Sequence, residues 1–196
     1  IAYPKTEKKL PKFIYYNELL EIINEAGKTK YNIRDKLIIE MLYATGVRIS
    51  ELVNIKINDI DFNNRRIIVL GKGNKERIVY YGEYADDILK IYLETLPSNN
   101  NGYVFLNSKG EKITDRGVRY IIDNIMKRLS IKTNVSPHVL RHTFATDMLN
   151  NGCDIKVVQE LLGHTSLRAT EIYTHVTNES IKKVYYEYFP RRDKDE

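Results

Sequence analysis

Residues 136–175 bring together side chains that bind phosphate groups or take part in their transfer. The stretch contains His138, Arg141, His164 and Tyr173, and all four histidines of the chain lie in it. A guanidinium group pairs with phosphate oxygens, an imidazole exchanges protons near neutral pH, and a phenol oxygen can act as a nucleophile. The residue types therefore indicate phosphate chemistry on the elements that carry this stretch.

The first of these elements is predicted to be a helix that begins at Ser136. A serine suits the N-cap, and Pro137 suits the first helical position because proline has no N–H to leave unpaired. His138 and Arg141 are three residues apart and share a polar face, which we expect to look outward. A separate apolar face would hold the helix against the core: Leu140, Phe144 and Met148. Because helix N-termini attract anions, we expect a phosphate site at the start of this helix.

Five segments resemble the signature boxes of tyrosine recombinases, the phage-integrase-like enzymes, and occur in the same order. They are Ala-Thr-Gly-Val-Arg-Ile-Ser-Glu-Leu at 44–52, Gly-Lys-Gly-Asn-Lys-Glu-Arg at 71–77, Ser-Pro-His-Val-Leu-Arg-His at 136–142, Leu-Leu-Gly-His at 161–164 and Ile-Tyr-Thr-His-Val at 172–176. The residues of these segments are most similar to those of Xer-type chromosome-resolution enzymes and their archaeal relatives. Five boxes in order make a specific signal, whereas one His-x-x-Arg would carry almost no weight.

The resemblance implies a site-specific recombinase in which a tyrosine breaks a DNA phosphodiester without a metal or another cofactor. The implied catalytic residues are Arg48, Lys72, His138, Arg141, His164 and Tyr173. The two arginines would hold the non-bridging oxygens, and His164 would hydrogen-bond the phosphate. His138 would accept the phenol proton, and Lys72 would protonate the leaving 5′ oxygen. The product would be a covalent 3′-phosphotyrosyl link at Tyr173, which a second strand's hydroxyl can reverse.

Several assignments stay open on the residues alone. Arg48 directly follows a predicted helix, where most arginines are solvated, and Glu51 would either hold its guanidinium or lie at the surface. Lys72 and Lys75 both lie in a predicted hairpin turn, and only the resemblance selects Lys72. Tyr173 is one of 15 tyrosines and is distinguished only by its position after the Gly-His pair of the fourth box.

Apolar spacing predicts the elements that must position these residues. In the first half of the chain, helices are predicted from Asn17 to about Gly27, at about 32–45, through 51–53 and near 83–96. In the second half they are predicted from Thr114 through Met126, from Ser136 through Met148, from Asp154 to Leu162, from Thr165–Ser166 to Tyr173, and from an Asn178 cap to Tyr188. Alternation between 55 and 82 predicts a three-stranded antiparallel sheet, with strands at 55–60, 66–70 and 77–81. The fold class is therefore α+β and mostly α, and the resemblance implies the tyrosine recombinase catalytic-domain fold.

The chain is expected to divide into three segments. Residues 1–12 are basic and contain two prolines, which is typical of a linker or arm. Family members usually carry a helical core-binding domain on that side, so the linker would lead from such a domain. Residues 13–177 would form the catalytic domain. Residues 178–196 would form a C-terminal helix and tail, whose apolar stripe we expect to dock on an adjacent protomer.

Composition is compatible with a nucleic-acid partner but does not prove one. The chain has 31 Lys and Arg against 26 Asp and Glu, a net charge of +5. A basic stripe in the predicted helix after Thr114 could follow a phosphate backbone: Arg116, Arg119, Lys127 and Arg128. One cysteine fits a reducing compartment, and no apolar run suits a membrane span or signal peptide, so we expect a cytoplasmic protein. The resemblance implies double-stranded DNA as partner and a homo-oligomer on it, a tetrameric synapse.

Three other interpretations of these residues compete with the recombinase. A zinc site is suggested by the i, i+4 spacing of His138 and His142, but no cysteine or acidic cluster completes a ligand shell in the sequence. A type IB topoisomerase would share the chemistry, although the Xer-like boxes argue against it. A non-catalytic DNA-binding module is less favoured because all six catalytic positions carry the expected residue types.

Overall fold

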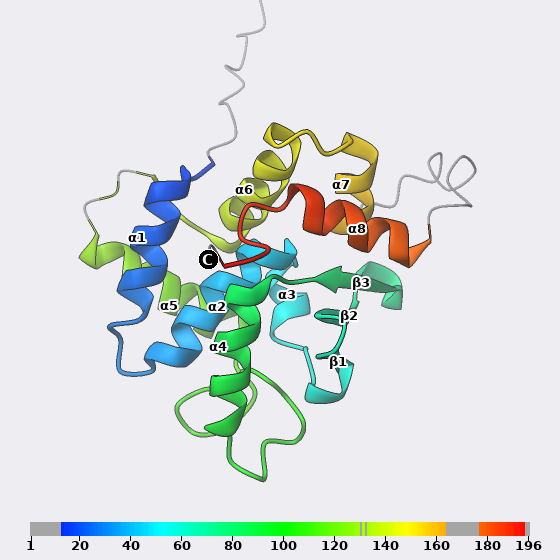
Figure 1. The fold of residues 1–196 in the computed structure, drawn as a ribbon. Coiled ribbons are helices and arrows are strands. Elements are labelled where there is room, and N and C mark those ends of the chain that lie inside the picture. The colour runs from blue at the N-terminus through cyan, green and yellow to red at the C-terminus, as the bar shows by residue number, and fades with distance from the viewer. Residues whose placement is uncertain (1–12, 130, 132, 164–176, 195–196) are drawn as a thin grey trace, which may run out of the picture.

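The computed structural model describes residues 13–129, 131, 133–163 and 177–194, and Figure 1 shows helices arranged around one central helix, α2. The helices are α1 (Tyr16–Ala26), α2 (Asn32–Thr45), α3 (Ile49–Leu52), α4 (Glu83–Glu94), α5 (Asp115–Arg128), α6 (Pro137–Asn150), α7 (Ile155–Leu162) and α8 (Asn178–Tyr188). Two 3-10 turns, η1 (Ile57–Asp59) and η2 (Lys72–Asn74), flank the strands β1 (Ile60–Asp61), β2 (Arg66–Leu70) and β3 (Glu76–Tyr80). The predicted class, mostly α with a small sheet, is confirmed.

Helix α2 is buried on all sides rather than along one stripe. It contacts α1, α4, α5 and α6, and its consecutive residues Leu37, Ile38 and Ile39 are all 0% exposed. Its buried charges are paired, Arg34 with Asp35 and Glu40 with Arg191, which allows the helix to lie in the middle of the core. The helix ends at Gly46, which has φ +60°, a backbone conformation that glycine adopts without strain. The chain then turns at once toward Arg48, so the end of the most buried helix positions the first candidate residue.

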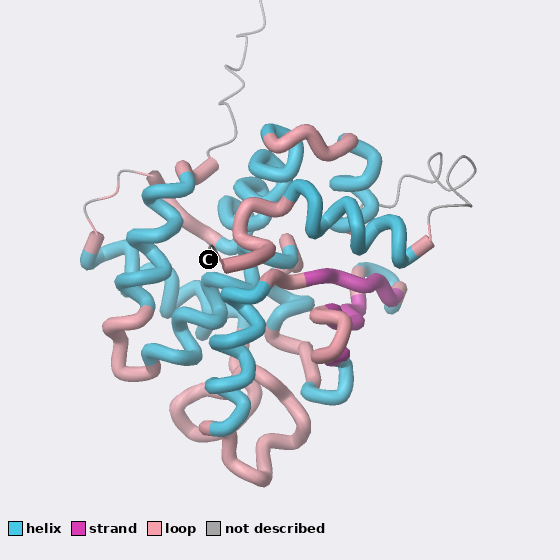
Figure 2. Tube along the Cα trace, viewed as in Figure 1, coloured by secondary structure: helices cyan, strands magenta, loops and turns pink. Residues whose placement is uncertain are grey.

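The sheet is antiparallel with the order β1-β2-β3 and lies on one side of the helices (Figure 2). Its main register pairs Ile67 with Val79 and Val69 with Arg77. The predicted first strand at 55–60 is wrong in extent, because β1 covers only Ile60–Asp61 and η1 precedes it. The Lys56 N–H donates to Asp59 Oδ2 at 2.8 Å, which closes a local turn in place of the predicted strand.

Three predicted helix ends can be compared with the structure. Ser136 Oγ accepts from the Val139 N–H at 3.3 Å at the start of α6, and the apolar face of that helix is fully buried. Gly163 ends α7 with φ +65°. The predicted Asn178 cap is wrong by one residue, because the Thr177 hydroxyl accepts from the Ser180 N–H and Asn178 is already helical.

The C-terminal segment packs on its own chain, and Figure 1 shows α8 beside α7. Tyr185 and Phe189 are 1% and 0% exposed. Arg191 Nε and Nη2 donate to the two carboxylate oxygens of Glu40 on α2, at 2.8 and 3.0 Å. On the apolar stripe of α8, Ile181 and Tyr185 are therefore covered within one chain, and Val184 and Tyr188 are half-buried. In the described ranges, none of the helices combines the length and apolar character that crossing a membrane demands.

Candidate active site

Arg48 lies immediately before α3 and is held by Glu51. Its backbone N–H donates to Glu51 Oε2 at 2.7 Å, and its Nη1 donates to Glu51 Oε1 at 3.1 Å. The Glu51 side chain is 1% exposed, whereas that of Arg48 is 34% exposed. Within the described part of the chain, the Arg48 side chain makes no other hydrogen bond, so most of its donors remain open. Of the two interpretations of Glu51, the one in which it holds Arg48 is confirmed.

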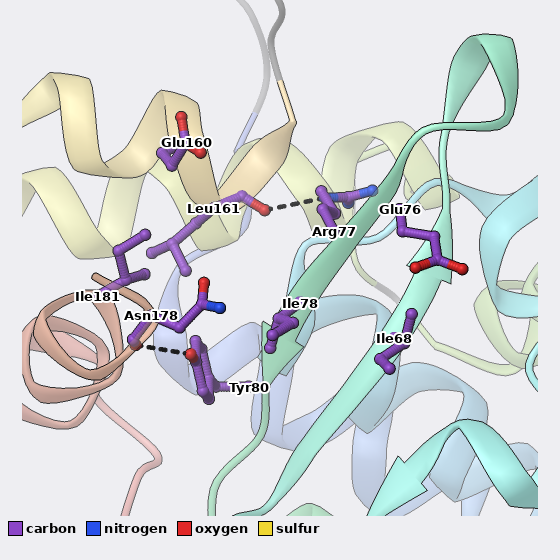
Figure 3. A pocket seen from close by; sticks show the side chains of 9 residues that line it. All are labelled: Ile68, Glu76, Arg77, Ile78, Tyr80, Glu160, Leu161, Asn178 and Ile181. Atoms are coloured by element: carbon purple, nitrogen blue, oxygen red, sulfur yellow. Dashed lines mark hydrogen bonds between the residues drawn. The ribbon is translucent and has the colours of Figure 1, made fainter. Parts of the chain in front are cut away.

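Arg77 on β3 is a second partner of Glu51, and it is not among the residues predicted to be functional. Arg77 Nη2 donates to Glu51 Oε2 at 3.0 Å, and Nη1 donates to Oε1. Arg77 Nε donates to the Leu161 carbonyl oxygen in the last turn of α7 at 3.2 Å (Figure 3). Its one sequence signal is its place as the last residue of the box at 71–77. Arg77 thus connects the sheet to both α3 and α7.

Arg141 on α6 is buried, and the expectation that its face looks outward is wrong for this residue. Its side chain donates to the Gly46 carbonyl oxygen through Nη1 and to the Leu162 carbonyl oxygen through Nη2, the latter at 2.7 Å. Both acceptors lie at helix C-termini, where carbonyl groups lack a partner within their own helix. Arg141 therefore fixes the end of α2 against the end of α7, directly beside the turn that leads to Arg48.

The three guanidinium groups lie close enough to repel one another. Burial lowers the pKa of Arg141 to about 10, and the charges of Arg48 and Arg77 contribute in the same direction. A guanidinium with that pKa is still protonated at neutral pH, so the repulsion persists in the folded protein. An anion bound between these groups would offset it, and a phosphate matches guanidinium geometry well.

Glu51 is the one carboxylate among these arginines in the described structure, and it is ionised. Its burial alone would raise its pKa, but hydrogen bonds from Arg77 and Arg48, together with their charges, outweigh burial and lower the pKa below its ordinary value. Three cations and one anion leave the cluster with excess positive charge. We call Arg48, Glu51, Arg77 and Arg141 the arginine cluster.

His138 and Lys72 lie near the cluster in the fold without contacting it through a hydrogen bond. His138 is exposed in the first turn of α6, one turn before Arg141. Lys72 is exposed in η2, the turn between β2 and β3, and Lys75 follows in the same hairpin. The base of this hairpin meets the cluster, because a Cβ on Gly71 would lie 3.4 Å from Glu51 Oε1. The geometry does not separate Lys72 from Lys75.

His164 and Tyr173 lie outside the described residues, as do the predicted Thr165–Ser166 helix and residues 1–12. The structure therefore brings together Arg48 and Arg141 of the six candidate residues and places Lys72 and His138 on neighbouring elements. In the described ranges, no group of three or more His, Cys, Asp or Glu side chains has the arrangement of a metal site.

A hollow of about 320 Å³ separates the sheet from the adjoining ends of α7 and α8 (Figure 3). Two hydrogen bonds join its sides, the Arg77–Leu161 bond and one from the Tyr80 hydroxyl to the Asn178 carbonyl oxygen at 2.8 Å. The remaining lining is mixed in polarity: Ile68, Glu76, Ile78, Glu160 and Ile181. Arg77 therefore belongs both to the arginine cluster and to the lining of this hollow.

Comparison with known proteins agrees with the geometry. The Phage integrase family matches residues 12–180. Tyrosine recombinase XerC of Staphylococcus epidermidis is 47% identical over 200 residues, covering 100% of this chain and 68% of that protein. Its Staphylococcus aureus counterpart is 48% identical over 199 residues, with 100% and 67% covered.

Two solved structures share the fold. A XerA recombinase matches with a TM-score of 0.75 at 35% identity, over 93% of this chain and 67% of that one. A XerH site-specific recombinase, in a pre-cleavage complex with its difH substrate, matches with a TM-score of 0.69 at 30% identity, over 95% and 56%. The chain belongs to the phage integrase family and, within it, to the Xer-type tyrosine recombinases.

Proposed function

We propose that this chain cuts and rejoins DNA strands at specific sites through a 3′-phosphotyrosyl link at Tyr173. The observation that carries the proposal is the arginine cluster, where Arg48 and Arg141 converge from different elements with excess positive charge. A phosphodiester gathers negative charge on its non-bridging oxygens as it is attacked, and prepositioned guanidinium groups stabilise that charge.

The proposed step is a transesterification, in which one phosphate ester bond replaces another. The Tyr173 oxygen bonds to phosphorus while the bond from phosphorus to the 5′ oxygen breaks. The phenol proton passes to His138, and Lys72 donates a proton to the departing 5′ oxygen. His164 hydrogen-bonds the phosphate. A 5′-hydroxyl of a second strand then attacks the same phosphorus and releases Tyr173, so the bond energy is conserved and no cofactor or ATP is consumed.

The proposed partner is a double-stranded recombination site bound by several copies of the chain, in a tetrameric synapse. The similar XerH structure was solved with a difH DNA substrate, which supports the choice of partner. Relatives named XerC favour chromosome dimer resolution, hence a role in chromosome partition, over integration or excision of a mobile element. The activity would then lie in the cytoplasm, with the chromosome.

We further propose that residues 13–177 act as the catalytic domain and that 178–196 dock on an adjacent protomer in the DNA-bound assembly. The basic face of α5, which carries Arg116, Arg119, Lys127 and Arg128, is a candidate contact for the DNA backbone. Topoisomerase-like relaxation and a non-catalytic DNA module are not favoured by the family match.

A nicked duplex that loses its 5′-hydroxyl fragment after cleavage tests the proposed chemistry. The wild-type chain should accumulate a covalent protein–DNA adduct, and Tyr173→Phe should form none because it lacks the nucleophilic oxygen. Tyr15→Phe, which alters an exposed tyrosine just before α1, should form adduct at the wild-type rate. DNA binding without any wild-type adduct would overturn the proposal in favour of a non-catalytic module.

A further inference from the structure

We propose that Arg77 is a positioning residue of this active site, which keeps Arg48 available to the phosphate by satisfying their shared partner Glu51. It would act without touching the DNA. The inference rests on the proposed function, because it assigns Arg48 to the scissile phosphate.

The hydrogen bonds of Arg77 show that its guanidinium is already committed within the protein. Each of its three side-chain nitrogens donates to a protein acceptor, two of them to Glu51 and one to Leu161. Its side chain is only 13% exposed. The Arg48 side chain donates one hydrogen bond in the described structure, to Glu51, and is 34% exposed. Of these two arginines, Arg48 is the one placed to receive a phosphate.

Glu51 explains why the second arginine is needed. A carboxylate that is 1% exposed has lost its water and requires charged partners. Arg77 supplies them in a planar, two-point pair, while Arg48 contributes a single side-chain hydrogen bond. If Arg77 were absent, Glu51 would draw the Arg48 guanidinium into the same two-point pair. The donors that Arg48 now leaves open would then face Glu51 instead of the phosphate.

Arg77 also ties this pair to the end of α7. Arg77 and Arg141 donate to the consecutive carbonyl oxygens of Leu161 and Leu162, in the last turn of that helix. Gly163 follows directly, and a Cβ at that position would lie 2.7 Å from Arg77 Cδ. The Arg77 stem therefore packs against a position that only glycine can occupy without displacing it. The Arg77 side chain thus joins β3, on which it lies, to α3 and α7 beside Arg48.

Arg77→Lys tests the inference, because lysine keeps the charge but cannot form the two-point pair. Adduct formation on the nicked duplex should slow by about 100-fold, the scale expected when a catalytic group is displaced by about 1 Å. The matched control is Arg66→Lys, on the adjacent strand β2, where the arginine is 39% exposed and pairs with Asp61 at the surface. That control should stay within about twofold of wild type.

Two altered substrates separate positioning of Arg48 from other effects. A methylphosphonate at the scissile position replaces a charged non-bridging oxygen with a methyl group, so it needs less help from Arg48. Most of the Arg77→Lys loss should therefore be recovered on it. A substrate with sulfur in place of the bridging 5′ oxygen has a leaving group that needs no proton from Lys72, and on it the loss should remain.

Each remaining outcome would overturn the inference. Recovery by the sulfur substrate alone would show that Arg77 acts through the Lys72 hairpin. An equal loss on all three substrates, with a lowered unfolding midpoint, would show a merely structural ion pair. A wild-type adduct rate in Arg77→Lys would refute the inference while the proposed function stands. No adduct from the wild-type chain on any substrate would refute both.

Discussion

Glu51 is the residue on which the geometry of the candidate site depends. Its two oxygens accept from Arg48, which lies just before α3, and from Arg77 on β3. Breaking a buried ion pair costs more than the pair itself contributes, because the remaining charges stay desolvated. The removal of this one negative charge would leave three guanidinium groups with no carboxylate between them in the described structure.

Glu51→Gln should therefore destabilise the protein, because glutamine has a similar shape but cannot offset the arginine charges. We expect a loss of about 3 kcal/mol in the free energy of unfolding at pH 7, measured by urea denaturation. Glu21→Gln, at an exposed position on α1, is the control and should change the free energy by less than about 0.5 kcal/mol. Equal effects of the two substitutions would contradict this account of the cluster.

The same variant predicts a pH dependence with a defined sign. The pKa of Glu51 is lowered in the folded protein, so the folded state binds this proton less readily than the unfolded state does. The stabilisation is fully present above the unfolded pKa of about 4.3 and is lost as the pH falls through the lowered folded pKa. The difference in stability between wild type and Glu51→Gln should shrink over that acidic range. A constant difference would be the opposing result.

Only part of the residue-level picture could be predicted from the sequence. The Arg48–Glu51 contact was accessible because the residues are three apart at the start of a helix. The role of Arg77 could not be predicted, because Arg77 lies 26 residues from Glu51 in the sequence and the fold of the sheet brings the two side chains together. The burial of Arg141 likewise depends on two helix ends that converge from distant parts of the chain.

At the level of elements, the hairpin β2–β3 and the end of α7 form one unit through Arg77. Gly163 has a positive φ and also lies against the Arg77 stem. Gly110 has a positive φ of +79°, but a Cβ there would meet nothing within 4 Å. Both glycines therefore have a left-handed backbone, but a Cβ at Gly163 would also collide with the Arg77 side chain.

Gly163→Ala should destabilise the protein more than Gly110→Ala does. Both substitutions should cost about 1 kcal/mol for the left-handed backbone, and Gly163→Ala should add the cost of displacing Arg77. In an Arg77→Ala background the additional cost should disappear, which a double-mutant cycle of urea unfolding measures. An additional cost that persists without the Arg77 side chain would place its origin elsewhere.

The elements themselves were largely predictable because their signals are local. Ser136, Thr114 and Gly163 mark helix ends through their own hydrogen bonds or backbone angle, and each does so in the structure. Residues 57–59 alternate as a strand would, but the Asp59 side chain closes a turn there. The alternation of apolar and polar residues could not reveal that the Asp59 side chain takes a backbone hydrogen bond that a strand would make with its neighbour.

At the scale of the whole molecule, the C-terminal segment is part of the core of its own chain. Helix α8 contributes Tyr185 to that core, and the ion pair between Arg191 and Glu40 follows it. Docking of residues 178–196 on an adjacent protomer would have to preserve these contacts or exchange them for equivalent ones. Truncation is therefore a poor test of docking, because it would also open the core.

Arg191→Met should lower the free energy of unfolding by about 3 kcal/mol, because it leaves Glu40 buried without its partner. Arg192→Met is a matched control at the next residue, where the side chain is 39% exposed, and it should change stability by less than about 0.5 kcal/mol. Urea unfolding of the chain without DNA measures both. Similar losses in the two variants would mean that the buried pair does not hold the C-terminal segment.

The central claim is that guanidinium groups from separate elements hold one phosphorus atom within reach of one phenol. A crystal structure of the chain on a cleaved DNA site with orthovanadate, which mimics five-coordinate phosphorus, tests it most directly. We predict that Arg48 and Arg141 both donate to the equatorial oxygens of the same vanadate, with the Tyr173 oxygen at one apical position. A vanadate bound away from the arginine cluster, or joined to a different residue, would contradict the account.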